Sequence, residues 1–228
     1  MNLTRMLQSQ GFGTRRACRN MILAQRLAIA GEIVSDPELE VNPVGLTFCV
    51  DAKIWHYREK AYLMLHKPAG YECSRHPKHH PGVLSLLPPQ LIERGVQTVG
   101  RLDEDTTGLL LLTDDGAFIH ALSSSKKKVP KVYRVTTKHP IGDEQLAALV
   151  QGVTLHDEPE MISAAAAEKL DEHSMRLTIT SGKYHQVKRM VAASGNRVTA
   201  LHREAVGPYM LPKDLAQGEW RWLTLSNP

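Results

Sequence analysis

The sequence predicts an α+β fold, in which a small helix–helix–hairpin module precedes a larger domain built on a mainly antiparallel mixed sheet. The 228 residues are 42% hydrophobic and 23% charged, which is the balance of a globular chain with a real core. Helical and strand-like patterns are interspersed without the regular strand–helix alternation of a parallel sheet. Leu177 and Ile179 alternate with polar neighbours, as expected for a strand with one packed face.

The first element of the small module is a short helix, because Leu3, Met6 and Leu7 follow helical spacing. Gly11 and Gly13 interrupt this pattern, and Thr14 offers an N-cap for a second helix. Along that second helix the side chains divide into an apolar face and a cationic face. The apolar face contains Ala17, Cys18, Met21 and Ile22, and the cationic face contains Arg15, Arg16 and Arg19.

Two short extended pieces follow, at residues 26–34 and 46–54, separated by a segment rich in turn-forming Pro, Asn and Gly. They complete the helix–helix–hairpin module. Residues 56–60 are polar and are interpreted as a linker. We therefore predict one domain over residues 1–58 and a second over residues 59–228.

The larger domain is expected to mix strands with three helices. A continuous apolar run from Leu109 to Leu112 predicts a strand that is buried on both faces. Gly195 supplies a stop signal for the last helix. The predicted strands lie at residues 61–68, 108–115, 131–137 and 174–182, and the predicted helices at 115–122, 143–151 and 186–194.

The charge distribution favours a polyanionic partner. The net charge is only +4, but five, six and six of the 28 Lys and Arg residues lie in three windows that contain no acid, at residues 1–31, 116–142 and 174–203. Such segments suit nucleic acid. A solvated helix face explains any one window equally well, so it is the three together that favour nucleic acid.

Several classes of protein are not indicated. Cys18, Cys49 and Cys73 are odd in number and widely spaced, which predicts neither a disulfide framework nor a zinc ribbon. The N-terminus has no apolar signal region, and no apolar stretch approaches the roughly 18 residues of a membrane span. We expect a cytoplasmic protein with no membrane partner, and nothing in the sequence suggests more than a monomer.

Two clusters of potential metal ligands need an interpretation. The first comprises Cys73, His76, His79 and His80, but Pro77 and Pro81 indicate a loop and the spacing matches no common zinc motif. The second is an acidic set that could hold two magnesium ions in a nuclease or phosphatase, comprising Asp103, Glu104, Asp105, Asp114 and Asp115. Because Asp114 to Gly116 is better explained as a turn and helix cap, we expect no metal site.

The most informative segment is GRLDEDTTGLLLLTDDG at residues 100–116, in which a carboxylate-rich turn precedes the buried strand. An acid at such a boundary is positioned by a rigid element and remains reachable from solvent. Asp103 occupies this position. Asp is also common in turns and caps, so the residues alone leave its role open.

The motif as a whole resembles the catalytic signature of the pseudouridine synthases. The resemblance rests on GRLDEDTTGLL at residues 100–110 and continues through HKPAGY at 66–71, VPKVYRV at 129–135 and GKYHQVKRMVAASGNRVTALHRE at 182–204. TRRACRNMILAQRLAIAGEIV, at residues 14–34, is similar to an S4-type RNA-binding domain, although residues 25–28 depart from its usual Gly-Arg-Val step. Together these segments place the chain closest to the RsuA-type branch, which acts on small-subunit (16S) ribosomal RNA.

The resemblance implies a reaction and three catalytic side chains. Enzymes of this family break the glycosidic bond of a uridine, turn the base and rejoin it through carbon 5, without a cofactor. By this resemblance Asp103 is the catalytic carboxylate, Lys188 its basic partner and Tyr133 the ring that stacks on the target base. Physical chemistry agrees with these roles. The ammonium of a nearby lysine keeps a carboxylate charged in a pocket that excludes water. A pyrimidine that has left its stack needs a flat surface, which an aromatic ring supplies.

The expected partner is 16S ribosomal RNA or a small-subunit assembly intermediate. The residues expected to bind RNA are Arg101, Arg15, Arg16, Arg19 and Arg189. Two other functions remain possible at this point, namely an RNA-binding assembly factor with a relic catalytic site and a metal-dependent enzyme that cleaves RNA.

Overall fold

The computed structural model describes residues 1–225 and divides into two compact units. Unit 1 comprises Met1–Tyr62, Leu87–Gln97 and Thr113–Asp115. Unit 2 comprises Leu63–Leu86, Thr98–Leu112 and the described residues from Gly116 onward. Since unit 1 takes in two segments from later in the sequence, the division at residues 58 and 59 stays a prediction.

Unit 1 begins with two helices whose caps follow from the sequence. Helix α1 spans Leu3–Ser9, and helix α2 spans Arg15–Leu23. The side chain of Thr14 accepts a hydrogen bond from the backbone N–H of Ala17 at 3.2 Å, which confirms the predicted N-cap. Cys18 and Ile22 are buried, as the amphipathic pattern of α2 predicts.

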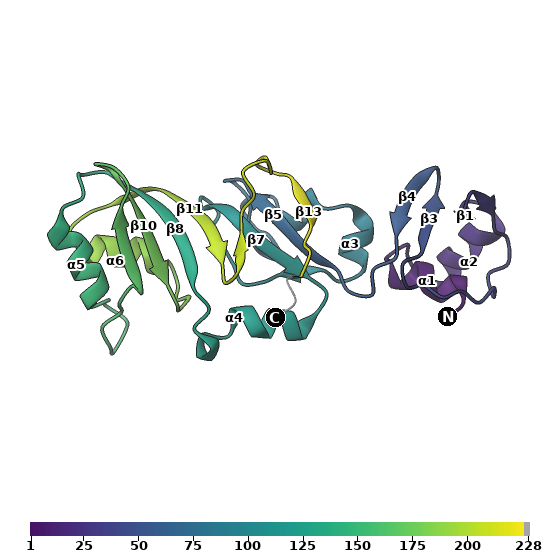
Figure 1. The fold of residues 1–228 in the computed structure, drawn as a ribbon, viewed down its shortest axis with the longest axis horizontal. Helices are drawn as coiled ribbons and strands as arrows, with labels where there is room; N and C mark the ends of the chain where they lie inside the picture. Colours follow the sequence, from purple (N-terminus) through teal and green to yellow (C-terminus); the bar gives the residue numbers. More distant parts are fainter. Residues whose placement is uncertain (226–228) are drawn as a thin grey trace. The chain divides into compact units, whose positions relative to one another are not determined.

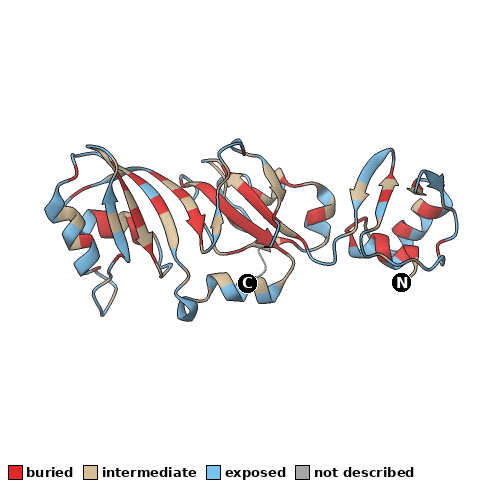
Figure 2. Cartoon of the chain, viewed as in Figure 1, coloured by how far each residue is buried: buried red, intermediate tan, exposed pale blue. Residues whose placement is uncertain are grey.

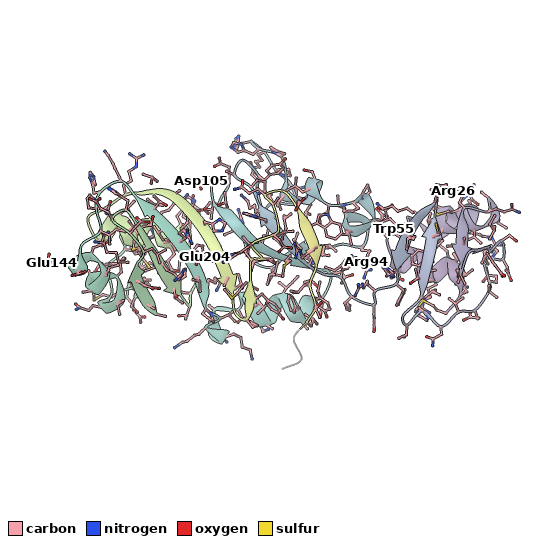
Figure 3. The ribbon with its side chains drawn as sticks, turned by 45° about the horizontal axis from the view of Figure 1, so that its top comes forward. Arg26, Trp55, Arg94, Asp105, Glu144 and Glu204 are labelled. Atoms are coloured by element: carbon pink, nitrogen blue, oxygen red, sulfur yellow. The ribbon has the colours of Figure 1, made fainter. Side chains whose placement is uncertain are left out.

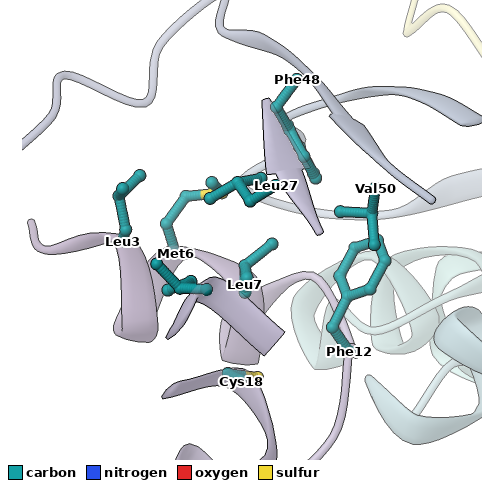
Figure 4. Close-up of a cluster of buried hydrophobic side chains, with 9 residues drawn as sticks. Leu3, Met6, Leu7, Phe12, Cys18, Leu27, Phe48 and Val50 are labelled. Carbon is teal, nitrogen blue, oxygen red and sulfur yellow. The ribbon is translucent and has the colours of Figure 1, made fainter. Parts of the chain in front are cut away.

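A four-stranded sheet in the order β2-β1-β3-β4 completes this part of unit 1. The strands are β1 (Leu27–Ile29), β2 (Glu32–Ile33), β3 (Thr47–Val50) and β4 (Lys53–His56). All three pairings are antiparallel, so the predicted hairpin is present and larger than expected. Side chains of α1, α2, β1 and β3 meet in a buried core (Figure 4), which contains Leu3, Met6, Leu7, Phe12, Cys18, Ile22, Leu27, Phe48 and Val50.

The residues predicted as a linker are held in place within unit 1. The backbone N–H of Arg58 donates to Gln10 Oε1 at 3.0 Å, and Gln10 Nε2 donates back to the carbonyl of Arg58 at 3.1 Å. Arg94 is 3% exposed, forms an ion pair with Asp114 at 2.7 Å and also donates to Gln10 Oε1. These contacts depend on residues far away in the sequence, so the polar composition of residues 56–60 does not reveal them.

Unit 2 is built on a nine-stranded sheet (Figure 1) in the order β13-β5-β7-β11-β8-β10-β9, with β12 paired to β11 and β6 paired to β7. Strand β11 runs parallel to β7 and antiparallel to β8, so the predicted mixed, mainly antiparallel sheet is confirmed. The strands are β5 (Tyr62–Lys67), β6 (Gln97–Thr98), β7 (Thr107–Thr113), β8 (Lys131–Thr137), β9 (Ala166–Lys169), β10 (Ser174–Ile179), β11 (Val198–Val206), β12 (Tyr209–Met210) and β13 (Trp220–Trp222).

The three helices predicted after residue 60 are present. They are α4 (Gly116–Ser123), α5 (Asp143–Gln151) and α6 (Gln186–Ala193), and α5 has the predicted bounds. Helix α3 (Pro89–Glu93), in unit 1, was not predicted, because its five residues are too few to show a helical period. Two 3₁₀ turns, η1 (Val83–Leu86) and η2 (Ser125–Lys127), were also not predicted.

Burial follows the predicted patterns in the central strands (Figure 2). Leu109 to Leu112 on β7 are each 0% exposed, which confirms a strand covered on both faces. On β10, buried Met175, Leu177 and Ile179 alternate with partly exposed residues, as predicted. Among residues 1–225, no helix is long and apolar enough to cross a membrane.

Candidate active site

The segment with the candidate carboxylate is a loop that leads into β7, and we call residues 100–106 the site loop. Gly100 opens it at φ +71°, and the N–H of Thr106 donates to the carbonyl of Asp103 at 3.1 Å. The side chain of Asp103 is 30% exposed. It is therefore held by a turn and still open to a ligand, as its position before a buried strand predicts.

A buried lysine fastens the site loop from inside. The ammonium of Lys67, at the end of β5, is 0% exposed and donates to the carbonyls of Glu104 and Thr106, both at 2.9 Å, and of Pro68 at 3.1 Å. Burial lowers the pKa of Lys67, and the charges of nearby acids partly offset this shift. Three carbonyl acceptors satisfy the ammonium, which otherwise costs much free energy to bury.

Gly108 allows the strand that follows the site loop to approach β11 closely. It has φ +108° and lies opposite Arg203 in the parallel pair. A Cβ atom at Gly108 would lie 2.3 Å from the carbonyl oxygen of Arg203 and 2.6 Å from its nitrogen. The Thr-x-Gly-Leu-Leu part of the motif thus contains a glycine that no other residue can replace without displacing backbone.

Lys188 on α6 lies between two carboxylates of the site loop. Its ammonium is 3.3 Å from Asp103 Oδ2, and 2.6 Å and 2.8 Å from the two carboxylate oxygens of Asp105. Asp105 is labelled in Figure 3. The structure thus brings Asp103 and Lys188 together, as the resemblance implies, and adds Asp105 as the closer partner of the lysine.

A histidine and a tyrosine extend this cluster. His185, the N-cap residue of α6, has φ +46°, and its Nε2 lies 3.4 Å from Asp103 Oδ1. The ring of Tyr184 stacks on the imidazole, with ring centroids 3.8 Å apart. Asp103 therefore has cationic or hydrogen-bonding groups near both of its carboxylate oxygens.

The shared lysine affects the charge states of the cluster. Burial raises the pKa of Asp105, but the hydrogen bond and charge of Lys188 outweigh this and leave the pKa below its usual value. Burial lowers the pKa of Lys188, yet the hydrogen bond from Lys188 to Asp105 and the charge of Asp103 leave it raised overall. The lysine is thus held as a cation beside both carboxylates.

Tyr133 belongs to the sheet rather than to the loop cluster. It is 7% exposed on β8 and lies opposite Leu177 of β10 and Arg203 of β11. Arg203 is itself buried, and its Nε donates to the carbonyl of Leu109 at 2.8 Å. These contacts link β8, the strand of Tyr133, through β11 to β7, the strand that the site loop enters.

The residues expected to bind RNA lie in different environments. Arg101 is exposed in the site loop, and Arg15 and Arg16 are exposed on α2 of unit 1. Arg19 forms an ion pair with Glu38 at 2.7 Å, and Arg189 forms one with Asp157. The last two arginines therefore already have carboxylate partners, which the sequence did not indicate.

Other bases of the acid-free windows are paired as well. Arg134 and Arg176 both donate to Glu204, at 3.0 Å and 2.9 Å, and Lys183 forms an ion pair with Glu158. Glu204 is labelled in Figure 3. The surface that an acid-free window forms is thus less positive than its sequence indicates, because the fold places acids from other segments beside its bases.

The two potential metal clusters have other environments. In residues 1–225, no group of three or more His, Cys, Asp or Glu side chains is arranged to hold a metal ion. Cys73 is buried, which raises the pKa of its thiol. Asp114 accepts hydrogen bonds from Arg94 and from the N–H of Ala61 at 2.8 Å, so its carboxylate serves as an ion-pair partner in unit 1.

Three functional side chains were missed from the sequence. Lys67 lies in the quoted HKPAGY segment and Asp105 in GRLDEDTTGLL, but nothing in the spacing assigns either a role. His185 precedes the helix of Lys188 and was counted only as part of a basic face. Their roles depend on contacts between segments far apart in the chain, such as the contact between Asp105 and Lys188, which are 83 positions apart.

Known proteins are similar to this chain in sequence and in fold. A family model described as RNA pseudouridylate synthase matches residues 61–193. The chain is 38% identical over 224 residues to the ribosomal small subunit pseudouridine synthase A of Yersinia pestis, covering 98% of this chain and 95% of that protein. The protein of the same name from Escherichia coli strain K12 is also 38% identical, with 98% and 96% covered.

A solved structure, titled crystal structure of pseudouridylate synthase, superposes with a TM-score of 0.69 at 35% identity, covering 98% of this chain and 96% of that one. The match extends through both units. It confirms the predicted α+β fold, and the similarity in sequence covers the segments that the motifs identified.

Proposed function

Because the chain belongs to the RNA pseudouridylate synthase family, we propose that it converts one uridine of small-subunit (16S) ribosomal RNA into pseudouridine. The relatives named above act on the small ribosomal subunit by name and match nearly the whole chain. The observation that carries the proposal in the structure is the pairing of Asp103 with Lys188 at 3.3 Å. A carboxylate with a permanent counter-charge at the start of a rigid strand suits chemistry on a sugar or base.

Asp103 acts on the target nucleotide, either as a nucleophile or as a base towards the ribose. Lys67 fixes the loop backbone, and Lys188 supplies the opposite charge. Preorganised groups of this kind cost no reorganisation at the moment of reaction. His185 and Asp105 position the pair, since one contacts Asp103 and the other contacts Lys188.

Tyr133 supplies the flat surface against which the flipped base stacks. Uridine must leave the stack of its neighbours before a carboxylate can reach the sugar and the base. Stacking on an aromatic ring is worth about 1 to 3 kcal/mol per base. The resemblance of VPKVYRV to the family motif supports this role, and Tyr133 lies on β8 opposite Arg203.

The reaction is balanced without a cofactor. The bond between nitrogen 1 and the ribose breaks, a bond between carbon 5 and the ribose forms, carbon 5 loses its proton and nitrogen 1 gains one. No atom is gained or lost overall, and no electron acceptor or nucleotide energy source is needed. The chain's own contribution is to hold the target base and the carboxylate of Asp103 together.

RNA binding is assigned to the arginines and to the N-terminal module. We assign Arg101 and Arg189 to the strand around the target, and Arg15, Arg16 and Arg19 to an RNA grip on the S4-like domain of residues 1–58, ahead of the catalytic domain of residues 59–228. The partner is 16S ribosomal RNA or a small-subunit assembly intermediate. We propose that the protein acts on this substrate in the cytoplasm and as a single chain.

A direct test measures tritium released from RNA whose uridines are labelled at carbon 5. The purified chain is expected to release tritium from small-subunit RNA and not from unrelated RNA, at the same rate with and without EDTA. An RNA-binding factor with a relic site would bind the RNA without releasing tritium. Shortened RNA together with a loss of activity on chelation would instead identify a metal-dependent nuclease.

A further inference from the structure

One positive segment of unit 2 is not used by the function proposed above. We call residues 75–80 the basic loop. All six residues are exposed, and five carry a cation or an imidazole, namely Arg75, His76, Lys78, His79 and His80. The sequence contains no acid between residues 73 and 92. A cluster of this kind matches the phosphates of a nucleic acid strand.

The basic loop is held by one carboxylate beneath it. Glu72 accepts hydrogen bonds from the backbone N–H groups of His79 at 2.9 Å, His80 at 3.0 Å and Lys78 at 3.2 Å. Its own backbone bonds to Pro81 and Val83, which closes the loop. The hydrogen bonds from His79 and His80 lower the pKa of Glu72. The acid thus fixes the backbone through its N–H groups, and the exposed side chains of Arg75, His76, Lys78 and His79 remain available to a partner.

The basic loop lies beside the site loop. The N–H of Gly70 donates to the carbonyl of Glu104 at 2.9 Å, and His80 Nε2 lies 3.7 Å from the carboxylate of Glu104. Glu104 follows Asp103 directly in the sequence. Lys67, which holds the site loop, precedes the same segment. A nucleic acid strand with one nucleotide at Asp103 therefore passes close to the basic loop.

We propose that the basic loop binds phosphates of the RNA strand that flanks the target nucleotide. This inference rests on the proposed function, because it takes RNA as the substrate. Guanidinium, ammonium and imidazole N–H groups all donate to phosphate oxygens, and such contacts set the register of a strand without reading its bases. The loop then fixes which nucleotide reaches Asp103 by holding its neighbours, and an acidic protein partner is the competing occupant.

The first test removes charge from the basic loop and measures affinity for small-subunit RNA at several salt concentrations. In the double variant Arg75→Gln/Lys78→Gln, affinity is expected to fall about 10-fold, and the slope of log K against log salt to become shallower by roughly 0.7 for each single-strand phosphate contact that is lost.

A charge-matched control is the double variant Lys126→Gln/Lys127→Gln, which removes two charges from the 3₁₀ turn η2 of the same unit. Equal losses of affinity in the two double variants would overturn the proposal, because they would reflect total charge alone. An unchanged affinity and salt slope in the loop variant would overturn it as well. The proposal would also be overturned if the loop variant kept its affinity for RNA but no longer bound an acidic protein, because the loop would then serve a protein partner.

The second test uses Glu72→Gln, which raises the net charge by one while weakening the acceptor that holds the loop. If the loop arrangement matters, RNA affinity falls about three-fold to 10-fold despite the added positive charge, with far-UV circular dichroism unchanged. Tighter binding would show that only total charge counts and would overturn the proposal. Because affinity is measured without turnover, a wild-type chain that binds RNA but releases no tritium would refute the proposed function and leave this test intact.

Discussion

The site loop and the basic loop are both irregular, and each is held by one charged side chain, a lysine for the site loop and a glutamate for the basic loop. Carbonyls of the site loop converge on the ammonium of Lys67, whereas N–H groups of the basic loop converge on the carboxylate of Glu72. Each loop then presents mainly side chains opposite in sign to its anchor, namely three carboxylates beside Arg101 in the site loop, and an arginine, a lysine and three histidines in the basic loop. Lys67 and Glu72 lie five residues apart, so one short segment anchors both loops.

The difference between the two anchors shows how a fold can place a loop rich in carboxylates beside a loop rich in cations. A side chain that binds only backbone fixes a loop without using the side chains of that loop. The burial of the two anchors differs, because Lys67 is fully buried and Glu72 is only partly buried. We expect the site loop to tolerate change less well than the basic loop, since chemistry demands tighter positioning than phosphate binding does.

Among the variants that keep the carboxylate of Asp103, the largest effect is expected from Lys188→Met, which leaves Asp103 and Asp105 without their shared cation. The rate of a single turnover should fall about 10²-fold to 10³-fold, because a preorganised charge is lost from the site. The measurement is pseudouridine formation in small-subunit RNA at saturating enzyme. Arg189→Gln, on the same helix and paired with Asp157, serves as the matched variant and should weaken RNA binding more than the rate. A normal single-turnover rate in Lys188→Met would contradict a role of the ion pair between Asp103 and Lys188 in the reaction.

A second test of the comparison is Lys67→Met, which deletes the cation that holds the site loop and leaves carbonyls without a donor. We expect the single-turnover rate to fall about 10-fold to 10²-fold, since small misplacements in an active site are costly. Thermal stability should fall too, because unsatisfied buried polar groups cost about 1 to 3 kcal/mol each. The counterpart in the basic loop is Glu72→Gln. An equal loss of rate in the two variants would contradict the expectation that the site loop tolerates change less well than the basic loop.

Gly108→Ala tests the strand that supports the site loop. The added methyl group meets the backbone of Arg203 in a positive-φ conformation, so we expect a loss of about 3 kcal/mol. For a chain of this length, that loss lowers the melting temperature by roughly 6 to 12 °C.

Gly100→Ala is the matched control, since Gly100 also has positive φ but has open space around its Cβ position. It should cost only about 1 kcal/mol. Similar melting temperatures for the two variants would contradict the close approach of β7 and β11.

The smallest effect concerns acid. Because the folded-state pKa of Asp105 lies below its unfolded value, its ion pair stabilises the fold above the usual Asp range near 4, and this contribution is lost as pH falls through the lowered pKa. The side chain of Asp105 is 58% exposed, so solvent screening limits the contribution to less than about 1 kcal/mol. Urea midpoints of wild type and Asp105→Asn should differ slightly at pH 7 and converge as the pH falls through the lowered pKa of Asp105. If the difference between the two urea midpoints grew as the pH fell, the lowered pKa of Asp105 would be contradicted.

Local patterns predicted the elements well where the chain supplies enough residues to show a period. Helix α5 begins and ends at its predicted residues, and β7 is as deeply buried as its apolar run implied. Helix α3 was missed because five residues cannot show a helical period. The cap at Thr14 was predictable because it depends on residues close in sequence.

The site was predictable only where motif and geometry coincide. Asp103 and Lys188 were identified through resemblance and lie 3.3 Å apart. The stronger contact of Lys188 with Asp105, the anchor at Lys67 and the pairing of Arg189 with Asp157 come from segments that folding alone brings together. Charge windows misled in the same way, because the acids that pair with Arg134 and Arg176 lie outside those windows.

The most direct measurement compares tritium release by Asp103→Asn and Asp105→Asn on small-subunit RNA labelled at carbon 5. Both variants remove one carboxylate from the same lysine, and both are expected to bind RNA normally. The account predicts that release by Asp103→Asn falls at least about 10³-fold, whereas Asp105→Asn loses less than about 10-fold. Full release by Asp103→Asn, or a complete loss confined to Asp105→Asn, would contradict it.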